Sequence, residues 1–235
     1  MEDPEGMQGV ALALFGGLAA SYDRTVEAAT AYQDRYWKKW VAEEVHLEPG
    51  EVVLDVGCGT LLLEERLGGS GASFVGIDVT PAMARLGRAK RLANVPLVIN
   101  GDAESLPFAD RSFDAAVSCY APKYVRVERL AGELARVVKP GAMVALYDFT
   151  KPKGVTSPFL EVYIQVGLRA LGLALRKTGN AAAFAFERLP GIVDGTVWDR
   201  EVVRAMEERG FETVAATPLT AGVVFAYCGR RRGGP

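Results

Sequence analysis

Residues 51–59 read Glu51-Val52-Val53-Leu54-Asp55-Val56-Gly57-Cys58-Gly59, and this stretch decides the fold. Its apolar run predicts a buried strand, and the glycines that follow permit a tight turn whose backbone can approach a ligand closely. A second apolar run, Phe74-Val75-Gly76-Ile77, ends at Asp78. A glycine turn followed by an acid at the end of the next strand is how a doubly wound sheet holds an adenosine-type ligand.

The chain continues as an alternation of strands and helices. We expect strands near residues 51–56, 73–78, 95–99, 113–119 and 142–148, and helices near 61–67, 81–91 and 127–138. Thr80 is a plausible N-cap for the second helix, with Pro81 at its first position, while Lys139-Pro140-Gly141 ends the third. This alternation predicts an α/β fold with a mostly parallel sheet and helices on both faces.

The segments before and after this region do not alternate between strands and helices. We expect residues 10–45 to be helical with a break near Gly16-Gly17, and residues 151–196 to hold an apolar helix near 158–176 and a stretch punctuated by glycine and proline. A helix near 199–209 then precedes two strands near 211–217 and 222–228, joined closely enough for an antiparallel hairpin. The predicted domains are therefore an N-terminal helical cap (1–50), a core (51–150 and 197–230), a helical lid insertion (151–196) and a flexible tail (231–235).

The composition excludes several classes of protein. The 235 residues are 49% hydrophobic and 24% charged, and the formal net charge is -2, which favours one globular core and gives no basic surface for nucleic acid. Cys58, Cys119 and Cys228 are too widely spaced for a disulfide framework or a metal site, so we expect reduced thiols in a cytoplasmic protein. The short, glycine-broken apolar stretch at residues 10–20 predicts neither a signal peptide nor a membrane span.

The glycine turn favours a particular kind of cofactor. A dinucleotide site has a third glycine where this chain has Leu62, and a phosphate loop has a lysine that is missing here. A ligand with ribose and adenine but no phosphate fits better. S-adenosylmethionine is such a ligand.

Five segments in order resemble the motifs of class I S-adenosylmethionine-dependent methyltransferases: residues 54–60, 75–78, 100–108, 112–117 and 137–142. The resemblance implies a Rossmann-like, doubly wound sheet of seven strands, with S-adenosylmethionine as the methyl donor. It implies an acid on the ribose at Asp78 and an acid on the adenine amine at Asp102. The cofactor-binding residues expected in this way are Tyr22, Asp55, Gly57, Cys58, Gly59, Thr60, Asp78, Val79, Met83, Gly101, Asp102, Ala103, Glu104, Cys119, Tyr120 and Tyr124.

The flanks resemble one branch, the C-methyltransferases of ubiquinone and menaquinone biosynthesis, in residues 15–23, 34–40, 148–152 and 219–224. Three segments depart from that family and are expected near the substrate. Asp34 stands where the family usually has histidine, and Ala121-Pro122-Lys123-Tyr124 replaces Gly-Leu-Arg-Asn. Phe184-Ala185-Phe186 replaces a segment rich in tyrosine.

The acceptor is expected to be a small hydrophobic molecule, with ring C-methylation of a prenylated quinol as the first hypothesis. The alternatives are O- or N-methylation of another metabolite, and a non-catalytic protein that binds S-adenosylmethionine. The apolar helix within residues 155–175 predicts a lid over an apolar tail, with a homodimer contact or a peripheral membrane contact of a cytoplasmic protein as alternatives. Asp148, at the end of the fifth strand, is the predicted substrate-facing acid or base, and Tyr22 is predicted to border the methyl group.

Overall fold

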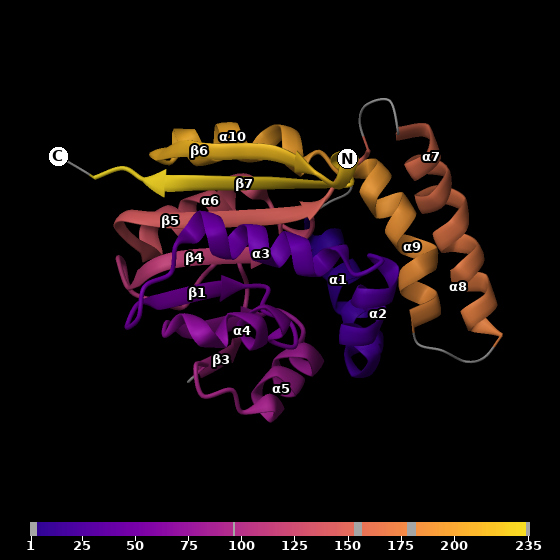
Figure 1. The fold of residues 1–235 in the computed structure, drawn as a ribbon, viewed down its shortest axis with the longest axis horizontal. Helices are drawn as coiled ribbons and strands as arrows, with labels where there is room; N and C mark the ends of the chain where they lie inside the picture. Colours follow the sequence, from indigo (N-terminus) through magenta and orange to yellow (C-terminus); the bar gives the residue numbers. More distant parts are fainter. Residues whose placement is uncertain (1–3, 96, 153–156, 178–181, 234–235) are drawn as a thin grey trace.

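The computed structural model describes residues 4–95, 97–152, 157–177 and 182–233. A seven-stranded sheet with the order β3-β2-β1-β4-β5-β7-β6 forms its centre (Figure 1). β7 runs antiparallel to both β5 and β6, and the other neighbours pair in parallel. The predicted fold class and the closing hairpin are therefore confirmed. The strands are β1 (Val52–Val56), β2 (Ser73–Asp78), β3 (Leu97–Asn100), β4 (Phe113–Cys119), β5 (Val138–Phe149), β6 (Phe211–Leu219) and β7 (Val224–Arg231).

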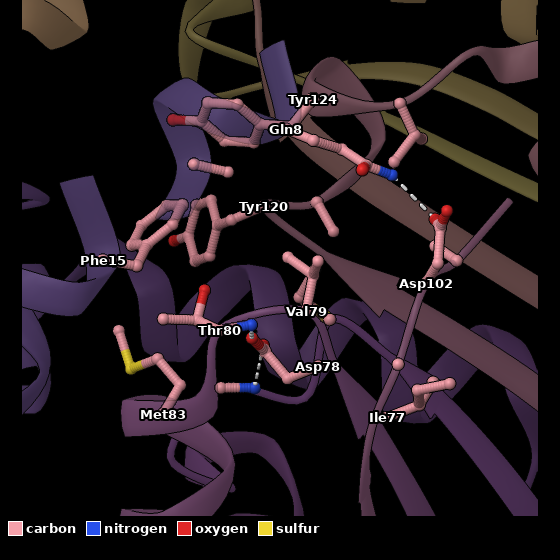
Figure 2. A pocket seen from close by; sticks show the side chains of 18 of the residues that line it. Gln8, Phe15, Ile77, Asp78, Val79, Thr80, Met83, Asp102, Tyr120 and Tyr124 are labelled. Atoms are coloured by element: carbon pink, nitrogen blue, oxygen red, sulfur yellow. Dashed lines mark hydrogen bonds between the residues drawn. The ribbon is translucent and has the colours of Figure 1, made fainter. Parts of the chain in front are cut away.

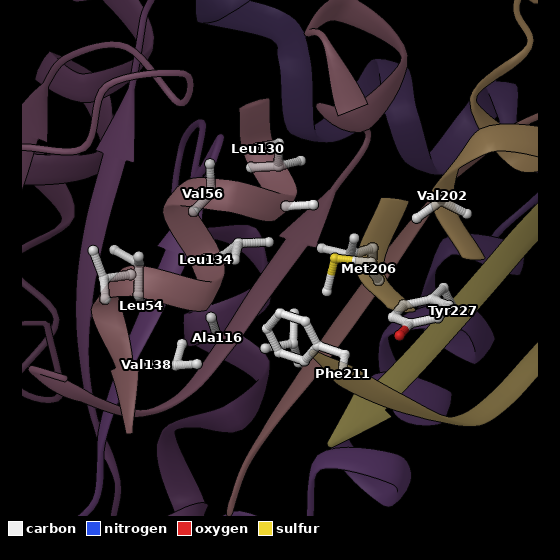
Figure 3. Packing of buried hydrophobic residues seen from close by; sticks show 14 of the residues in the cluster. Leu54, Val56, Ala116, Leu130, Leu134, Val138, Val202, Met206, Phe211 and Tyr227 are labelled. Atoms are coloured by element: carbon white, nitrogen blue, oxygen red, sulfur yellow. The ribbon is translucent and has the colours of Figure 1, made fainter. Parts of the chain in front are cut away.

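Helices cover both faces because side chains along each buried strand alternate between them. On one face, Leu54 and Val56 pack with α6 (Val127–Val137) and α10 (Trp198–Glu208) in one hydrophobic cluster (Figure 3). On the other face, Val53 packs with α3 (Gln33–Val45) and α4 (Leu62–Leu67). Burying one leucine of these clusters stabilises the fold by about 1.5–3 kcal/mol. α5 (Pro81–Lys90) packs beside β2 and β3.

The N-terminal helices break close to the predicted place. α1 (Pro4–Leu18) ends one residue after Gly17, where η1 (Ala19–Ser21) begins, and a second turn follows α2 (Tyr22–Ala29), where Ala31 and Tyr32 have positive φ. Gly16 and Gly17 themselves stay within α1, because glycine weakens a helix without ending it. Here Leu14 and Leu18 pack against the inserted helices and hold α1 together.

The insertion after β5 forms a helical hairpin beside the sheet (Figure 1). α7 (Ser157–Val162), a π-helical turn η4 (Tyr163–Gly167) and α8 (Leu168–Arg176) make up the predicted apolar helix. The partner is α9 (Ala182–Gly195), which the sequence predicted only as a stretch punctuated by glycine and proline. The stretch is helical because packing overrides propensity: a Cβ on Gly172 would lie 2.8 Å from Glu187 Cγ, so the two helices approach closely despite Pro190 inside α9.

Candidate active site

The glycine turn between β1 and α4 is fixed by β2. Gly57 N and Cys58 N donate to Ile77 O at 2.8 and 3.1 Å. Gly57 has φ +78°, and a Cβ there would lie 2.5 Å from Ala121 Cβ, so only glycine fits. Gly59, with φ +57°, also lies in the left-handed region.

Asp78 closes this turn from the end of β2. Its Oδ2 accepts from Gly59 N at 2.8 Å and its Oδ1 accepts from Thr80 N at 2.7 Å (Figure 2). Thr80 is the N-cap residue of α5, as predicted, although its side chain makes no capping bond and its amide donates to the Asp78 carboxylate. Burial raises the pKa of Asp78, while the Thr80 and Gly59 amides oppose that shift. Each carboxylate oxygen keeps further lone pairs for a ligand.

A cavity of about 640 Å³, part of it open to solvent, lies over these strand ends (Figure 2). We call it the strand-end cavity. It contains most of the predicted cofactor-binding residues: Tyr22, Gly57, Gly59, Asp78, Val79, Met83, Gly101, Asp102, Ala103, Cys119, Tyr120 and Tyr124. The sequence therefore identified one continuous site from segments that lie far apart in the chain.

Four predicted cofactor residues do not line the strand-end cavity, because each is engaged elsewhere. Cys58 packs its Sγ against Gly76, where a Cβ would come within 2.7 Å. Thr60 donates to Asp23 Oδ1 at 2.5 Å. Glu104 accepts from the Arg126 amide and Nε, each at 2.7 Å. The fourth, Asp55, points into the protein interior.

Asp55 and Glu64 form a buried pair of carboxyl groups beneath the glycine turn. Within the described part of the chain, no N–H or hydroxyl donor reaches Asp55 Oδ1 or either carboxyl oxygen of Glu64, so a proton held between the two carboxyl groups supplies their hydrogen bond. Burial, followed by the charge of Glu64, raises the pKa of Asp55 well above its ordinary value, and burial also raises the pKa of Glu64. The pair therefore retains protons at a higher pH than exposed carboxyl groups do.

The N-terminal helix contributes site residues that the sequence did not identify as such. Gln8, Ala11 and Phe15 of α1 line the strand-end cavity, and Gln8 Nε2 donates to Asp102 Oδ1 at 2.8 Å (Figure 2). Their helical spacing puts them on one face of α1, which is the signal that could have identified them. Thr80, Ile77, Ala121 and Val125 complete the lining.

A second cavity of about 550 Å³ adjoins the first, and we call it the apolar cavity. The two share Phe15, Tyr22, Tyr120 and Tyr124, so these four aromatic side chains stand at their boundary. α9 supplies part of the wall. The remaining lining residues are Leu14, Leu18, Thr25, Val26, Ala29, Thr30, Lys123, Phe149, Ala185, Phe186 and Leu189.

Lys123 alone is charged among the described residues that line the apolar cavity, and it is paired with Asp148. Lys123 Nζ lies 2.5 Å from Asp148 Oδ1, and the carboxylate also accepts from Lys123 N at 3.0 Å and Phe149 N at 2.7 Å. Burial lowers the pKa of Lys123 and raises the pKa of Asp148, and the attraction within the pair opposes both shifts. The predicted substrate-facing Asp148 lines neither cavity and lies behind Lys123, whereas Tyr22 lines both.

Tyr120 is held at the boundary by a second buried charge. It has φ +65°, and its hydroxyl donates to Asp34 Oδ1 at 2.8 Å. Asp34 is fully buried, where Lys38 and Arg66 compensate its charge. Burial, followed by the charge of Asp34, raises the pKa of Tyr120, which keeps the phenol neutral. Asp34 therefore holds the Tyr120 side chain in its place at the boundary between the two cavities.

Comparison with known proteins places this site in a family. Residues 54–146 match the family described as Methyltransferase domain. The demethylmenaquinone methyltransferase of Corynebacterium urealyticum (strain ATCC 43042 / DSM 7109) is 33% identical over 93% of this chain and 92% of that protein. The same enzyme of Mycolicibacterium gilvum (strain PYR-GCK) is 32% identical over 90% of each.

The chain belongs to the demethylmenaquinone methyltransferase family. Solved structures share the fold of this methyltransferase. A SAM-dependent methyltransferase from Aquifex aeolicus aligns with a TM-score of 0.58 at 18% identity, covering 98% of this chain and 99% of that one. The geranyl diphosphate C-methyltransferase from Streptomyces coelicolor A3(2) aligns with a TM-score of 0.59 at 14% identity, over 84% and 77% of the two chains.

The chain is an S-adenosylmethionine-dependent methyltransferase, and the strand-end cavity fits this cofactor. The glycine turn, where a Cβ on Gly57 would clash, leaves backbone groups free to approach the amino-acid end. Asp78 offers carboxylate oxygens for the ribose hydroxyls, and Asp102 can accept from the adenine amine.

Proposed function

We propose that this enzyme methylates a ring carbon of a quinol whose apolar tail occupies the apolar cavity. The observation that carries the proposal is the apolar cavity itself, which adjoins the strand-end cavity across Phe15, Tyr22, Tyr120 and Tyr124. An apolar acceptor gains about 25 cal/mol for each Å² that it removes from water. The names of the relatives, demethylmenaquinone methyltransferases, support a quinol as the acceptor.

The contribution of the chain to this reaction is to position the acceptor and exclude water. When bound, S-adenosylmethionine supplies a methyl group already activated by the positive charge on sulfur. The turn at Gly57, Asp78 and Asp102 fix the donor, while the aromatic boundary fixes the plane of an acceptor ring and keeps water away. Such positioning is worth several kcal/mol of the barrier.

The proposal is tested with the purified full-length chain and methyl-labelled S-adenosylmethionine. A naphthoquinol with a prenyl tail and its tail-free analogue are the acceptors, kept reduced, and products are analysed by mass spectrometry and proton NMR. We expect one added methyl group, loss of one ring proton, and a lower KM for the tailed acceptor. A product that keeps all its ring protons would show O-methylation. Cofactor binding by calorimetry without transfer to either acceptor would indicate a non-catalytic protein.

We further propose that the enzyme is cytoplasmic and reaches a membrane-borne acceptor by laying α7–η4–α8 on the bilayer surface. Residues 158–176 have a mean hydropathy of 1.3 and are long enough to span a membrane by length and composition. Only 17% of the stretch is buried in the protein, which leaves most of it free for contact with lipid. Phe159, Val166 and Leu173 are 81%, 62% and 55% exposed on its outer side. An apolar helix face of this kind binds the boundary between lipid headgroups and acyl chains.

Co-sedimentation with phosphatidylglycerol vesicles tests this contact. The wild-type chain is expected to pellet with vesicles, and the F159S/V166S/L173S variant to stay in the supernatant with unchanged turnover of the tail-free acceptor. A wild-type dimer in analytical ultracentrifugation that the same substitutions dissociate, without vesicle binding, would assign the face to a second copy of the chain.

A further inference from the structure

The ammonium of Lys123 is an unusual group in an apolar acceptor cavity. Its Nζ lies 4.4 Å from the centre of the Tyr124 ring, 5.5 Å from that of Phe149 and 5.9 Å from that of Tyr120. Lys123 is 7% exposed as a whole residue and 1% exposed in its side chain, and the residue is part of the cavity lining. Keeping the ammonium charge in this buried position costs desolvation energy. A buried charge beside a ligand cavity is therefore a candidate for a functional group that meets the ligand.

The hydrogen bonds of Lys123 use two of the three protons of its ammonium group. One N–H points to Asp148 Oδ1 and a second to Tyr120 O at 3.1 Å. Within residues 4–95, 97–152, 157–177 and 182–233, the third meets no oxygen or nitrogen acceptor. Asp148 is itself fixed by two backbone amides, so it holds the ammonium in one position beside the aromatic boundary.

We propose that Lys123 binds the ring hydroxyl of the acceptor and stabilises its oxyanion, and that Asp148 takes up the hydroxyl proton through Lys123. This inference rests on the proposed function, since it requires an acceptor with an ionisable ring hydroxyl. A fixed cation in a water-poor cavity stabilises a developing oxyanion far more than it would in water. An ionised hydroxyl in turn raises the electron density of the neighbouring ring carbon that accepts the methyl group.

The proton transfers balance. Lys123 gives a proton to Asp148 and receives the hydroxyl proton, so the ammonium stays charged, the acid becomes neutral and the acceptor becomes an oxyanion. The oxyanion's ring carbon forms the new carbon–carbon bond as the methyl–sulfur bond breaks, which leaves a neutral ring ketone and a neutral thioether. The ring proton on that carbon then leaves to solvent, and the oxygen recovers its proton from Asp148 through Lys123. One proton is released in each turnover.

The test compares wild type with K123M/D148N, which replaces both charges by neutral groups of similar size. Neutralising the pair together avoids the unpaired buried charge that a single substitution leaves behind. The probe is 1-naphthol, whose ionised form has its own absorption band. We expect the apparent pKa of bound 1-naphthol to be about one unit or more lower in wild type than in the double variant. We expect kcat on the quinol to fall about 100-fold or more in the double variant, with cofactor affinity little changed.

Two results would overturn the inference: the same pKa of bound 1-naphthol in both proteins, or the same kcat. Either would make the pair structural. K123R, which keeps the charge, should retain the 1-naphthol shift. Thermal melting and calorimetric titration of S-adenosylmethionine verify that each variant is folded. If wild type methylates neither quinol but lowers the pKa of bound 1-naphthol, the acceptor assignment fails while the role of Lys123 stands.

Discussion

The strand-end cavity and the apolar cavity share an aromatic boundary but are built in different ways. The first is formed largely by backbone turns and acids at the carboxyl ends of strands that the sheet holds in register. The second is formed by side chains of α1, α2 and α9, which meet outside the sheet, with one buried ion pair behind it. The sheet thus fixes the donor half of the site, whereas the acceptor half depends mainly on side-chain packing, with Tyr120 and Phe149 at the strand ends as its contacts with the sheet. Substitutions in the two halves should therefore fail in different ways.

The largest expected effect is on the acceptor half, in Asp148→Asn. This change leaves the buried ammonium of Lys123 without its counter-charge, which should lower the free energy of unfolding by about 3–5 kcal/mol. Urea unfolding of D148N beside K123M/D148N measures it. The double variant should recover much of the loss, and equal losses in both would show that the ion pair is not what stabilises this wall.

On the donor half, Gly57→Ala should cost about 2–4 kcal/mol, because it combines a left-handed residue with overlap against Ala121. Gly59→Ala is the matched control. Its Cβ would meet nothing closer than Tyr22 Cε1 at 3.9 Å, so only the backbone cost of about 1–2 kcal/mol remains. Thermal melting and calorimetric titration of S-adenosylmethionine compare the two. A rigid backbone cradle would be contradicted if Gly57→Ala bound the cofactor as tightly as wild type.

A smaller effect, on acceptor binding alone, should distinguish the acceptor half of the site from the donor half. Phe186→Ala removes a buried wall of the apolar cavity and should raise KM for a tailed acceptor about tenfold, with cofactor affinity unchanged. Phe184→Ala, on the same helix but 44% exposed and outside the lining, should leave KM unchanged. Steady-state kinetics and cofactor titration provide the comparison. A parallel loss of cofactor affinity in F186A would mean that the cavities do not act separately.

The smallest effect concerns pH and the pair beneath the glycine turn. Because the folded-state pKa values of Asp55 and Glu64 are raised, their contribution to stability is complete below the unfolded-state pKa of about 4. It is lost as pH rises through the folded-state values, at up to about 1.4 kcal/mol per pH unit for each proton. Glu64→Gln should flatten the fall of stability that urea unfolding measures as pH rises above the unfolded-state pKa. Glu65→Gln, at a side chain 51% exposed, should retain the wild-type slope.

The same contrast explains what the sequence could predict. The glycine turn and Asp78 lie within one strand–helix–strand unit, so a local pattern predicts their geometry. Gln8 reaches the site only through the tertiary packing of α1. Lys123 and Phe186 lie in segments that the family resemblance placed near the substrate, but no local pattern indicated which wall of the cavity they would form. Asp148 was placed at the correct strand end, but sequence could not show that Lys123 would cover it. The division into cap, core and lid remains a prediction.

α1 borders both cavities, with Gln8 and Ala11 on one side, Leu14 and Leu18 on the other and Phe15 between them. A ligand in either cavity would contact the same helix, so a first ligand that orders α1 would let the second bind with a smaller loss of entropy. Donor and acceptor should accordingly bind with positive cooperativity, each improving the affinity of the other by the same factor. Product release should follow the same coupling. When one product leaves, α1 loosens, and the other product dissociates more readily.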